Sequence, residues 1–220
     1  MRLPQIKHYD HDITEVHYNI GEVTNPDMTL EIEDRVKFIK KLEQLLRSSF
    51  EYRDLIQFLK EEMNFDKCII LTNVNYETAH LEFHHEPLRL YEVCDIVLRK
   101  HETLYGEVSI FKVAEEIMLS HYRGEIPLVP LTITCHQLVH SANLFIPIQL
   151  IQSSAFGDWK KFYDKYSLYM TDDYKSYLQD YIEKSRLVAE DFQLPLLERK
   201  YTYIYCDNFN FPKKISIDEE

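Results

Sequence analysis

The chain of 220 residues is long enough for one large or two small domains, and its 45% of apolar residues can bury a core. Its 37 acidic and 25 basic residues give a formal charge of −12, which argues against a protein that holds nucleic acid by bulk positive charge. With only 4 glycines and no glycine-rich motif, the chain also lacks the loops that cradle phosphates in nucleotide-binding folds.

The spacing of apolar residues predicts an α+β chain in which helices dominate. A weak alternation of apolar residues predicts a first strand within residues 8–22. Amphipathic helices are predicted at residues 31–47, 55–63, 90–101, 109–122, 135–142, 158–169 and 172–192. Further strands are predicted at residues 67–72 and 78–85, joined by a polar turn, and at residues 200–206.

Charge and element order divide the chain into a strand and helical flank at residues 1–63, a central module at residues 64–157, and a helical region with a late strand at residues 158–220. Within the module, residues 126–157 contain no Asp, Glu, Lys or Arg, which predicts a buried segment. The aromatic and acidic helices of the flanks suit a homodimer contact or a protein partner. The aromatic stripe along residues 159–169 is interpreted as a packing face, with base stacking as its alternative.

Cysteine usage and the length of apolar runs predict a cytoplasmic protein. The 4 cysteines include no C-x-x-C pair, which in a chain of this size is typical of reduced intracellular thiols. The first residues lack the apolar run of a signal peptide, so none is expected. No stretch of about 18 apolar residues is present either, so we expect no membrane-spanning segment.

Several of the 10 histidines are spaced as metal ligands. His136 and His140 lie four residues apart, so their imidazoles share one face of the predicted helix. His84 ends a predicted strand and would complete a three-ligand site with an open position for water or a phosphate oxygen. The neighbouring His85 points to the opposite side of the strand and could act as a general base. Glu82 could orient a metal-bound imidazole or remain a solvated carboxylate.

Two segments, HLEFHHEPL at residues 80–88 and IPLVPLTITCHQLVH at residues 126–140, resemble the HNH, or ββα-metal, endonucleases. The resemblance covers residues 66–150 and implies an HNH-like ββα-metal core with a helical insertion. It implies that His84, His136 and His140 hold one divalent ion, with Zn, Mg, Mn and Ni as candidates. It further implies that His85 activates water for hydrolysis of a DNA phosphodiester bond. Phages and mobile elements commonly encode such enzymes, so a phage origin and a host-cell location are expected.

The chain departs from the family pattern in the loop and in the cysteines. Pro127 stands where the family has an asparagine that supports the loop before the metal-binding helix. Of the cysteines that bind a structural zinc in many members, Cys68 and Cys135 remain, while Leu71 and Thr132 occupy the positions of their partners. We therefore expect no structural zinc.

Two functional hypotheses are compatible with this sequence. The first is a metal-dependent DNA endonuclease, for which the insertion supplies the candidate phosphate contacts Arg89, Arg99, Lys100 and Arg123. The second is a catalytically decayed HNH-like scaffold that binds a protein partner through its acidic surface. This alternative accounts for Pro127 and for the net charge of −12.

Overall fold

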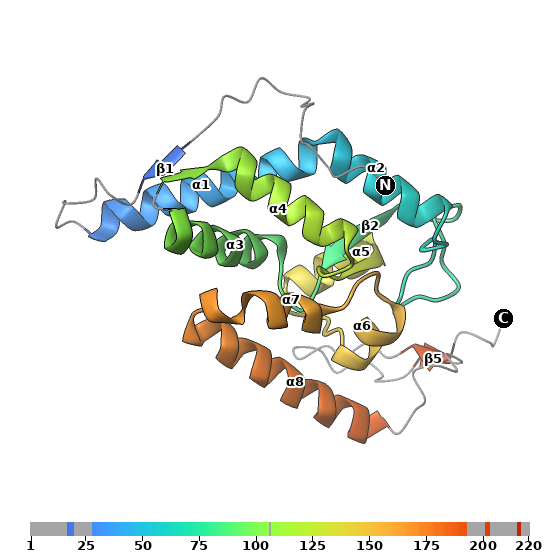
Figure 1. The fold of residues 1–220 in the computed structure, drawn as a ribbon. Coiled ribbons are helices and arrows are strands. Elements are labelled where there is room, and N and C mark those ends of the chain that lie inside the picture. The colour runs from blue at the N-terminus through green and yellow to red at the C-terminus, as the bar shows by residue number, and fades with distance from the viewer. Residues whose placement is uncertain (1–16, 20–27, 106, 193–200, 203–214, 217–220) are drawn as a thin grey trace. The chain divides into compact units, whose positions relative to one another are not determined.

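The computed structural model describes residues 17–19, 28–105, 107–192, 201–202 and 215–216 (Figure 1). They form a mixed α+β structure that is mostly helical, with two-stranded antiparallel sheets. The chain forms two compact units, each assembled from segments separated in sequence. Among the described residues, unit 1 comprises those up to position 57, 88–126 and 159–172, and unit 2 comprises 58–87, 127–158 and those from 173 onward.

Unit 1 consists mainly of helices that pack through their apolar faces. Its helices are α1 (Met28–Ser48), the first part of α2 (Phe50–Glu61), α3 (Leu90–Tyr105), α4 (Ile110–Tyr122), α7 (Trp159–Tyr166) and the 3-10 helix η1 (Ser167–Tyr169). The antiparallel strands β1 (His17–Asn19) and β3 (Glu107–Ser109) accompany them. Leu42 and Leu46 of α1 and Ile117 of α4 are fully buried, as their helical spacing predicts.

A polar network in unit 1 joins α3, α4 and α7 around the carboxylate of Glu116. Its donors are Lys100 Nζ at 2.5 Å, His101 Nε2 at 2.7 Å and the Tyr166 hydroxyl at 2.7 Å. Burial raises the pKa of Glu116, but these hydrogen bonds outweigh it and lower the pKa to about 2. The network therefore holds a carboxylate charge inside the unit by surrounding it with donors.

His121 of α4 makes the stability of unit 1 depend on pH. Its side chain is fully buried, Nδ1–H donates to the Ile117 carbonyl at 2.9 Å, and the ring meets Tyr52 edge-on at a centroid distance of 5.8 Å. Burial lowers the pKa of His121 from 6.5 to about 4, because the imidazolium loses its hydration there.

We expect the free energy of unfolding to fall as the pH is lowered from the unfolded pKa of His121 to its folded pKa. The unfolded chain takes up a proton in this range that the folded chain does not, so acid favours unfolding. The loss is about 3 kcal/mol, and it levels off below the folded pKa. His121→Phe keeps an aromatic ring against Tyr52 and should lack this component. Urea unfolding of both proteins across the range measures the difference, and parallel pH profiles would contradict the prediction.

Unit 2 contains the second sheet and the shorter helices. Its elements are β2 (Leu81–His85), β4 (Leu128–Thr132), α5 (Ile133–His140), α6 (Ile148–Ser154), most of α8 (Asp172–Phe192), β5 (Tyr201–Thr202) and β6 (Ile215–Ser216). Strands β5 and β6 pair with each other in antiparallel fashion. The arrangement that positions the histidines is formed by β2, β4 and α5 alone.

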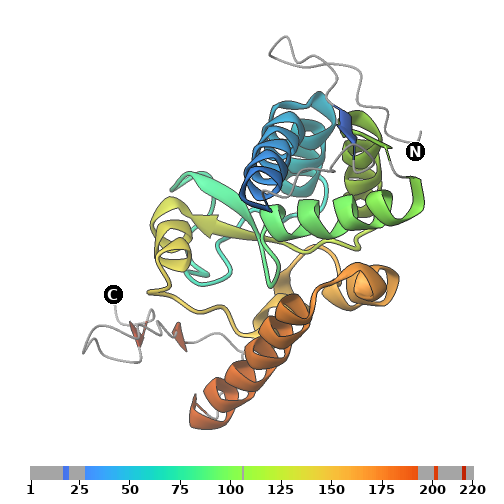
Figure 2. The same ribbon diagram turned by 90° about the vertical axis from the view of Figure 1, so that its left-hand side faces the viewer.

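Strands β2 and β4 pair antiparallel, with His85 opposite Leu128. All five residues of β4 are buried, in agreement with its apolar sequence. The Pro130 carbonyl within β4 accepts the Ile69 amide at 3.0 Å. Strand β4 leads directly into α5 (Figure 2). The Thr132 hydroxyl caps that helix by accepting the Cys135 amide at 3.2 Å. The cap fixes the direction in which α5 leaves the sheet.

The helices predicted from sequence are confirmed within one turn or so at their ends. The prediction at residues 172–192 has the same bounds as α8, and the two helices expected in the insertion are α3 and α4. Of the strand predicted within residues 8–22, the structure describes residues 17–19, which form β1. Of the strand predicted at residues 200–206, it describes residues 201–202, which form β5. The other residues of both predictions lie outside the described part of the chain. No described helix is long and apolar enough to cross a bilayer.

The predicted strand at residues 67–72 is wrong, and so is its pairing with the next strand. The Cys68 amide donates to the Val74 carbonyl and the Val74 amide donates to the Leu71 carbonyl, which closes a compact loop. Cys68, Ile69 and Ile70 are buried, but they belong to this loop and to no assigned strand. The partner of β2 is β4, and neither β4 nor α6 was predicted.

Candidate metal centre

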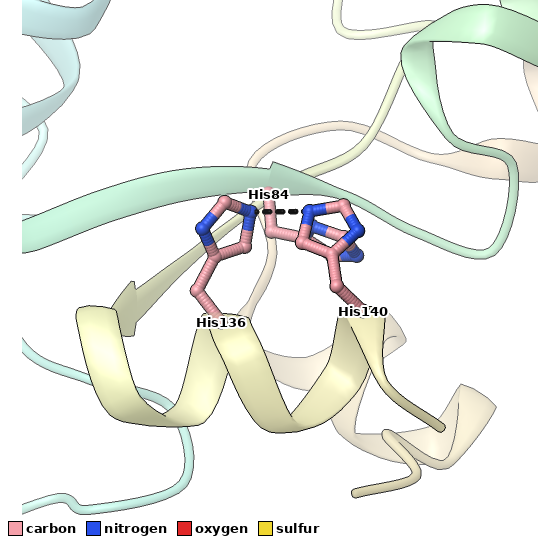
Figure 3. A group of neighbouring side chains, drawn as sticks. All are labelled: His84, His136 and His140. Carbon is pink, nitrogen blue, oxygen red and sulfur yellow. Dashed lines mark hydrogen bonds between the residues drawn. The ribbon is translucent and has the colours of Figure 1, made fainter. Parts of the chain in front are cut away.

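Three histidines from two elements converge in unit 2. His84 comes from β2, while His136 and His140 lie one turn apart on α5. Figure 3 shows the two helical imidazoles rising from one side of α5 toward the strand that carries His84. One ring nitrogen from each histidine lies within 4.8 Å of the other two. Among the described residues, no other three His, Cys, Asp or Glu side chains come together in this way.

The spacing of the rings is close to that of ligands around one ion. The Nε2 atoms of His136 and His140 are 2.9 Å apart, and their ring centroids are separated by 4.5 Å. The His84 ring lies 4.9 Å from the His136 ring and 5.0 Å from the His140 ring, in both cases edge-on. Nitrogen ligands of a tetrahedral zinc ion are about 3.3 Å apart, so small side-chain rotations would suffice to reach that geometry.

Two glutamates orient two of these imidazoles. Glu82 of β2 contacts Nδ1 of His136, and Glu86, just after β2, lies 2.8 Å from Nε2 of His84. A carboxylate accepts hydrogen bonds, so we assign the proton to Nδ1 of His136 and to Nε2 of His84. The opposite nitrogen of each ring then carries the lone pair that a metal requires. Carboxylates behind ligating histidines have this effect in known metal sites.

Two tyrosines of helix α8 contact the backbone close to Glu86. The Tyr177 hydroxyl donates to the Pro87 carbonyl at 3.1 Å, and the Tyr181 hydroxyl donates to the Ile146 carbonyl. Burial raises the pKa of Tyr181 well above its usual value, and the negative charge of the nearby Glu86 contributes to the same shift. Glu86 was not singled out in the sequence. Its position two residues after His84 was the available signal.

Burial differs across the cluster and leaves one side open. His84 is 3% exposed and Glu86 is 5% exposed, whereas His136 is partly buried and His140 is exposed. The α5 side can therefore admit a water molecule or a ligand oxygen to an ion held by the three rings. A set of neutral imidazoles suits zinc or nickel better than magnesium, which prefers oxygen ligands.

His85 does not join this cluster. It is the last residue of β2 and only 3% exposed, and consecutive strand residues project to opposite faces of the sheet. Pro127, at the position where the HNH endonucleases that the sequence resembles have an asparagine, is buried directly before β4 begins. Pro127 has no side-chain hydrogen-bonding group, so it cannot support the loop as an amide would.

The four candidate phosphate contacts belong to unit 1, whereas the histidines belong to unit 2. Arg99 Nε donates to Asp95 at 2.9 Å, and Lys100 is one of the donors to Glu116. Arg89 and Arg123 are exposed. Arg99 and Lys100 thus stabilise carboxylates within their own unit, and their role as phosphate contacts stays a prediction.

Replacing Glu86 by glutamine is expected to weaken metal binding about 10- to 100-fold, because the amide no longer anchors the protonated nitrogen of His84 with a charge. Calorimetric titration of zinc into both proteins measures the change. Glu77→Gln is the matched control, because Glu77 is an exposed glutamate in the loop before β2 and lies outside the histidine cluster. Equal affinities for wild type and a folded Glu86→Gln protein would contradict the assigned orienting role.

The described residues therefore define a mixed α+β protein with a candidate three-histidine metal centre. A family model of the bacteriophage G278-like virion proteins matches residues 2–209. Since the match covers nearly all of the sequence, the chain belongs to the bacteriophage G278-like virion protein family, which confirms the expected phage association. No curated protein and no solved structure matches the chain.

Proposed function

We propose that the chain is a metal-dependent endonuclease of the ββα-metal type that hydrolyses DNA phosphodiester bonds. The observation that supports this proposal is the convergence of His84, His136 and His140 at the junction of two antiparallel strands and the following helix. The same order of elements and ligands is what the resemblance to HNH endonucleases implies.

Each residue of the site has a distinct task in this proposal. His84, His136 and His140 bind one divalent ion, which would supply positive charge for the phosphate and for the leaving oxygen. Glu82 and Glu86 hold two of the rings in the tautomer that presents a lone pair. His85 accepts the proton of the attacking water. Because His85 is only 3% exposed, local opening at the end of β2 has to precede proton transfer.

A second candidate function is a non-catalytic component of the phage particle that the metal stabilises and that binds a protein partner through its acidic surface. The burial of His85 favours this alternative, since a general base must reach its water. The net charge of −12 and the engagement of Arg99 and Lys100 with carboxylates point in the same direction.

A nicking assay on supercoiled plasmid DNA separates the two functions. We expect wild-type protein loaded with Zn, Ni, Mn or Mg to produce open circles, and the His136→Ala/His140→Ala protein to produce none. His80→Ala is the control, because His80 is an exposed histidine outside the cluster. A wild-type protein that binds metal but nicks DNA with none of the four ions would contradict the nuclease proposal and support the second candidate.

A further inference from the structure

Two buried cysteines in unit 2 lie in direct contact. Cys68 belongs to the loop before β2 and is fully buried, while Cys135 lies in the first turn of α5 and is 4% exposed. The Cys135 thiol donates a hydrogen bond to the sulfur of Cys68. The contact links the loop before β2 to the N-terminal end of α5, where Cys135 directly precedes His136.

The surroundings of Cys68 favour a thiolate at this position. Its sulfur accepts the Leu71 amide at 3.3 Å, and the amides of Ile70 and Thr132 also point to it. The hydrogen bond from Cys135 and these amides lower the pKa of Cys68 below its usual value, against the opposing effect of burial. Cys94 in unit 1 shows the opposite behaviour, because burial raises the pKa of its thiol well above the usual value.

Among the described residues, Cys68 and Cys135 have no further side chains beside them that could complete a zinc site. Leu71 and Thr132 stand at the two positions where additional cysteines would complete a four-thiolate site. No third His, Cys, Asp or Glu joins Cys68 and Cys135 within the part of the chain that the structure describes. Two adjacent thiols outside such a set of ligands are instead suited to oxidation to a disulfide.

We propose that Cys68 and Cys135 form a reversible disulfide that ties the loop at residues 67–74 to the first turn of α5. The proposal is independent of nuclease activity, because it rests on the sulfur contact and not on the histidines. With a hydroperoxide as the oxidant, the Cys68 thiolate attacks one peroxide oxygen, releases hydroxide and becomes a sulfenic acid. The Cys135 sulfur then attacks the Cys68 sulfur, and its proton leaves with the hydroxyl group as water. Two thiols and one hydrogen peroxide thus give one disulfide and two waters.

The bond would act on the element that carries two of the three candidate metal ligands. Helix α5 has only 8 residues, which is shorter than the ~12–15 residues that an isolated helix needs for stability in water. A phage particle leaves the reducing interior of its host for oxidising surroundings, where a disulfide persists. For a chain of a virion protein family, such a bond would therefore form after release from the cell.

The test uses the full chain with Cys94→Ala and Cys206→Ala, so that only Cys68 and Cys135 can react. After brief treatment with hydrogen peroxide, we expect the intact mass to fall by two hydrogen atoms and a peptide linked between Cys68 and Cys135 to appear on non-reducing digestion. Dithiothreitol should restore both thiols. In the same background, Cys135→Ser should yield a sulfenic acid at Cys68 that dimedone traps, and no linked peptide.

Three results would overturn the proposal. The first is stepwise gain of oxygen at either cysteine without a linked peptide. The second is the absence of any reaction under conditions that oxidise a small dithiol. The third is zinc retained by the His136→Ala/His140→Ala protein and lost on Cys68→Ser, which would make the cysteines metal ligands.

Discussion

The His85→Ala protein is expected to bind metal as wild type does and to nick DNA about 100- to 10,000-fold more slowly, the usual range for loss of a general base. Metal binding should survive because His85 lies outside the group of nitrogens formed by His84, His136 and His140. Single-turnover nicking rates and zinc titrations of the same preparations measure the two properties separately.

Because His85 is buried, its removal also leaves a cavity, so a second variant is needed to separate chemistry from packing. His85→Gln keeps most of the volume and a polar group but cannot accept the proton at neutral pH. If His85→Gln is folded, binds zinc and nicks DNA as slowly as His85→Ala, the loss of activity comes from the missing general base and not from altered packing. His84→Ala should lose both binding and cleavage. A His85→Gln protein that cleaves at the wild-type rate would exclude His85 as the base.

The helices could be predicted from the sequence because their signals are local. Residues 172–192 repeat apolar side chains at helical spacing, and the structure has α8 with those bounds. Helix α5 has a local signal of the same kind, because it follows Thr132, a residue type that favours helix N-caps, and the Thr132 hydroxyl caps it. The pairing of β2 with β4 was not predictable in this way. Their residues are separated by an insertion that folds in the other unit, and hydrophobic spacing carries no information about such long-range partners.

The candidate site shows the same division between local and long-range information. The spacing of His136 and His140 places them on one face of a helix, so the sequence alone predicts their proximity. The contact between Glu82 and His136 depends on the register that sets Leu81 opposite Thr132, the residue that caps α5. Without that register, Glu82 could not be distinguished from a solvated carboxylate.

The candidate phosphate contacts show what sequence proximity leaves open. Arg99 and Lys100 follow His85 closely along the chain, and this order suggested a shared site. The structure assigns the insertion to unit 1, where Asp95 and Glu116 accept their hydrogen bonds. A sequence shows which charges are near one another along the chain, but the acceptors that neutralise them come from folding.

Zinc is expected to stabilise unit 2, raising the free energy of unfolding of wild type by about 4 kcal/mol when its free concentration is 1,000 times the dissociation constant. The ion would link β2 to α5 through His84, His136 and His140, and α5 is too short to be stable without such contacts. Chelation should reverse the gain. The His136→Ala/His140→Ala protein should show none of it, while His80→Ala should retain it.

The measurement has to distinguish the two units, and the position of the single tryptophan makes this possible. Trp159 begins α7 in unit 1, so its fluorescence reports on that unit during urea unfolding. Amide hydrogen exchange of α5 reports on unit 2. Slower exchange in α5 with zinc, lost in the double variant, is the expected result. A zinc-dependent gain that persists in the double variant would place the ion elsewhere, and the absence of any gain in wild type would contradict a metal centre at these histidines.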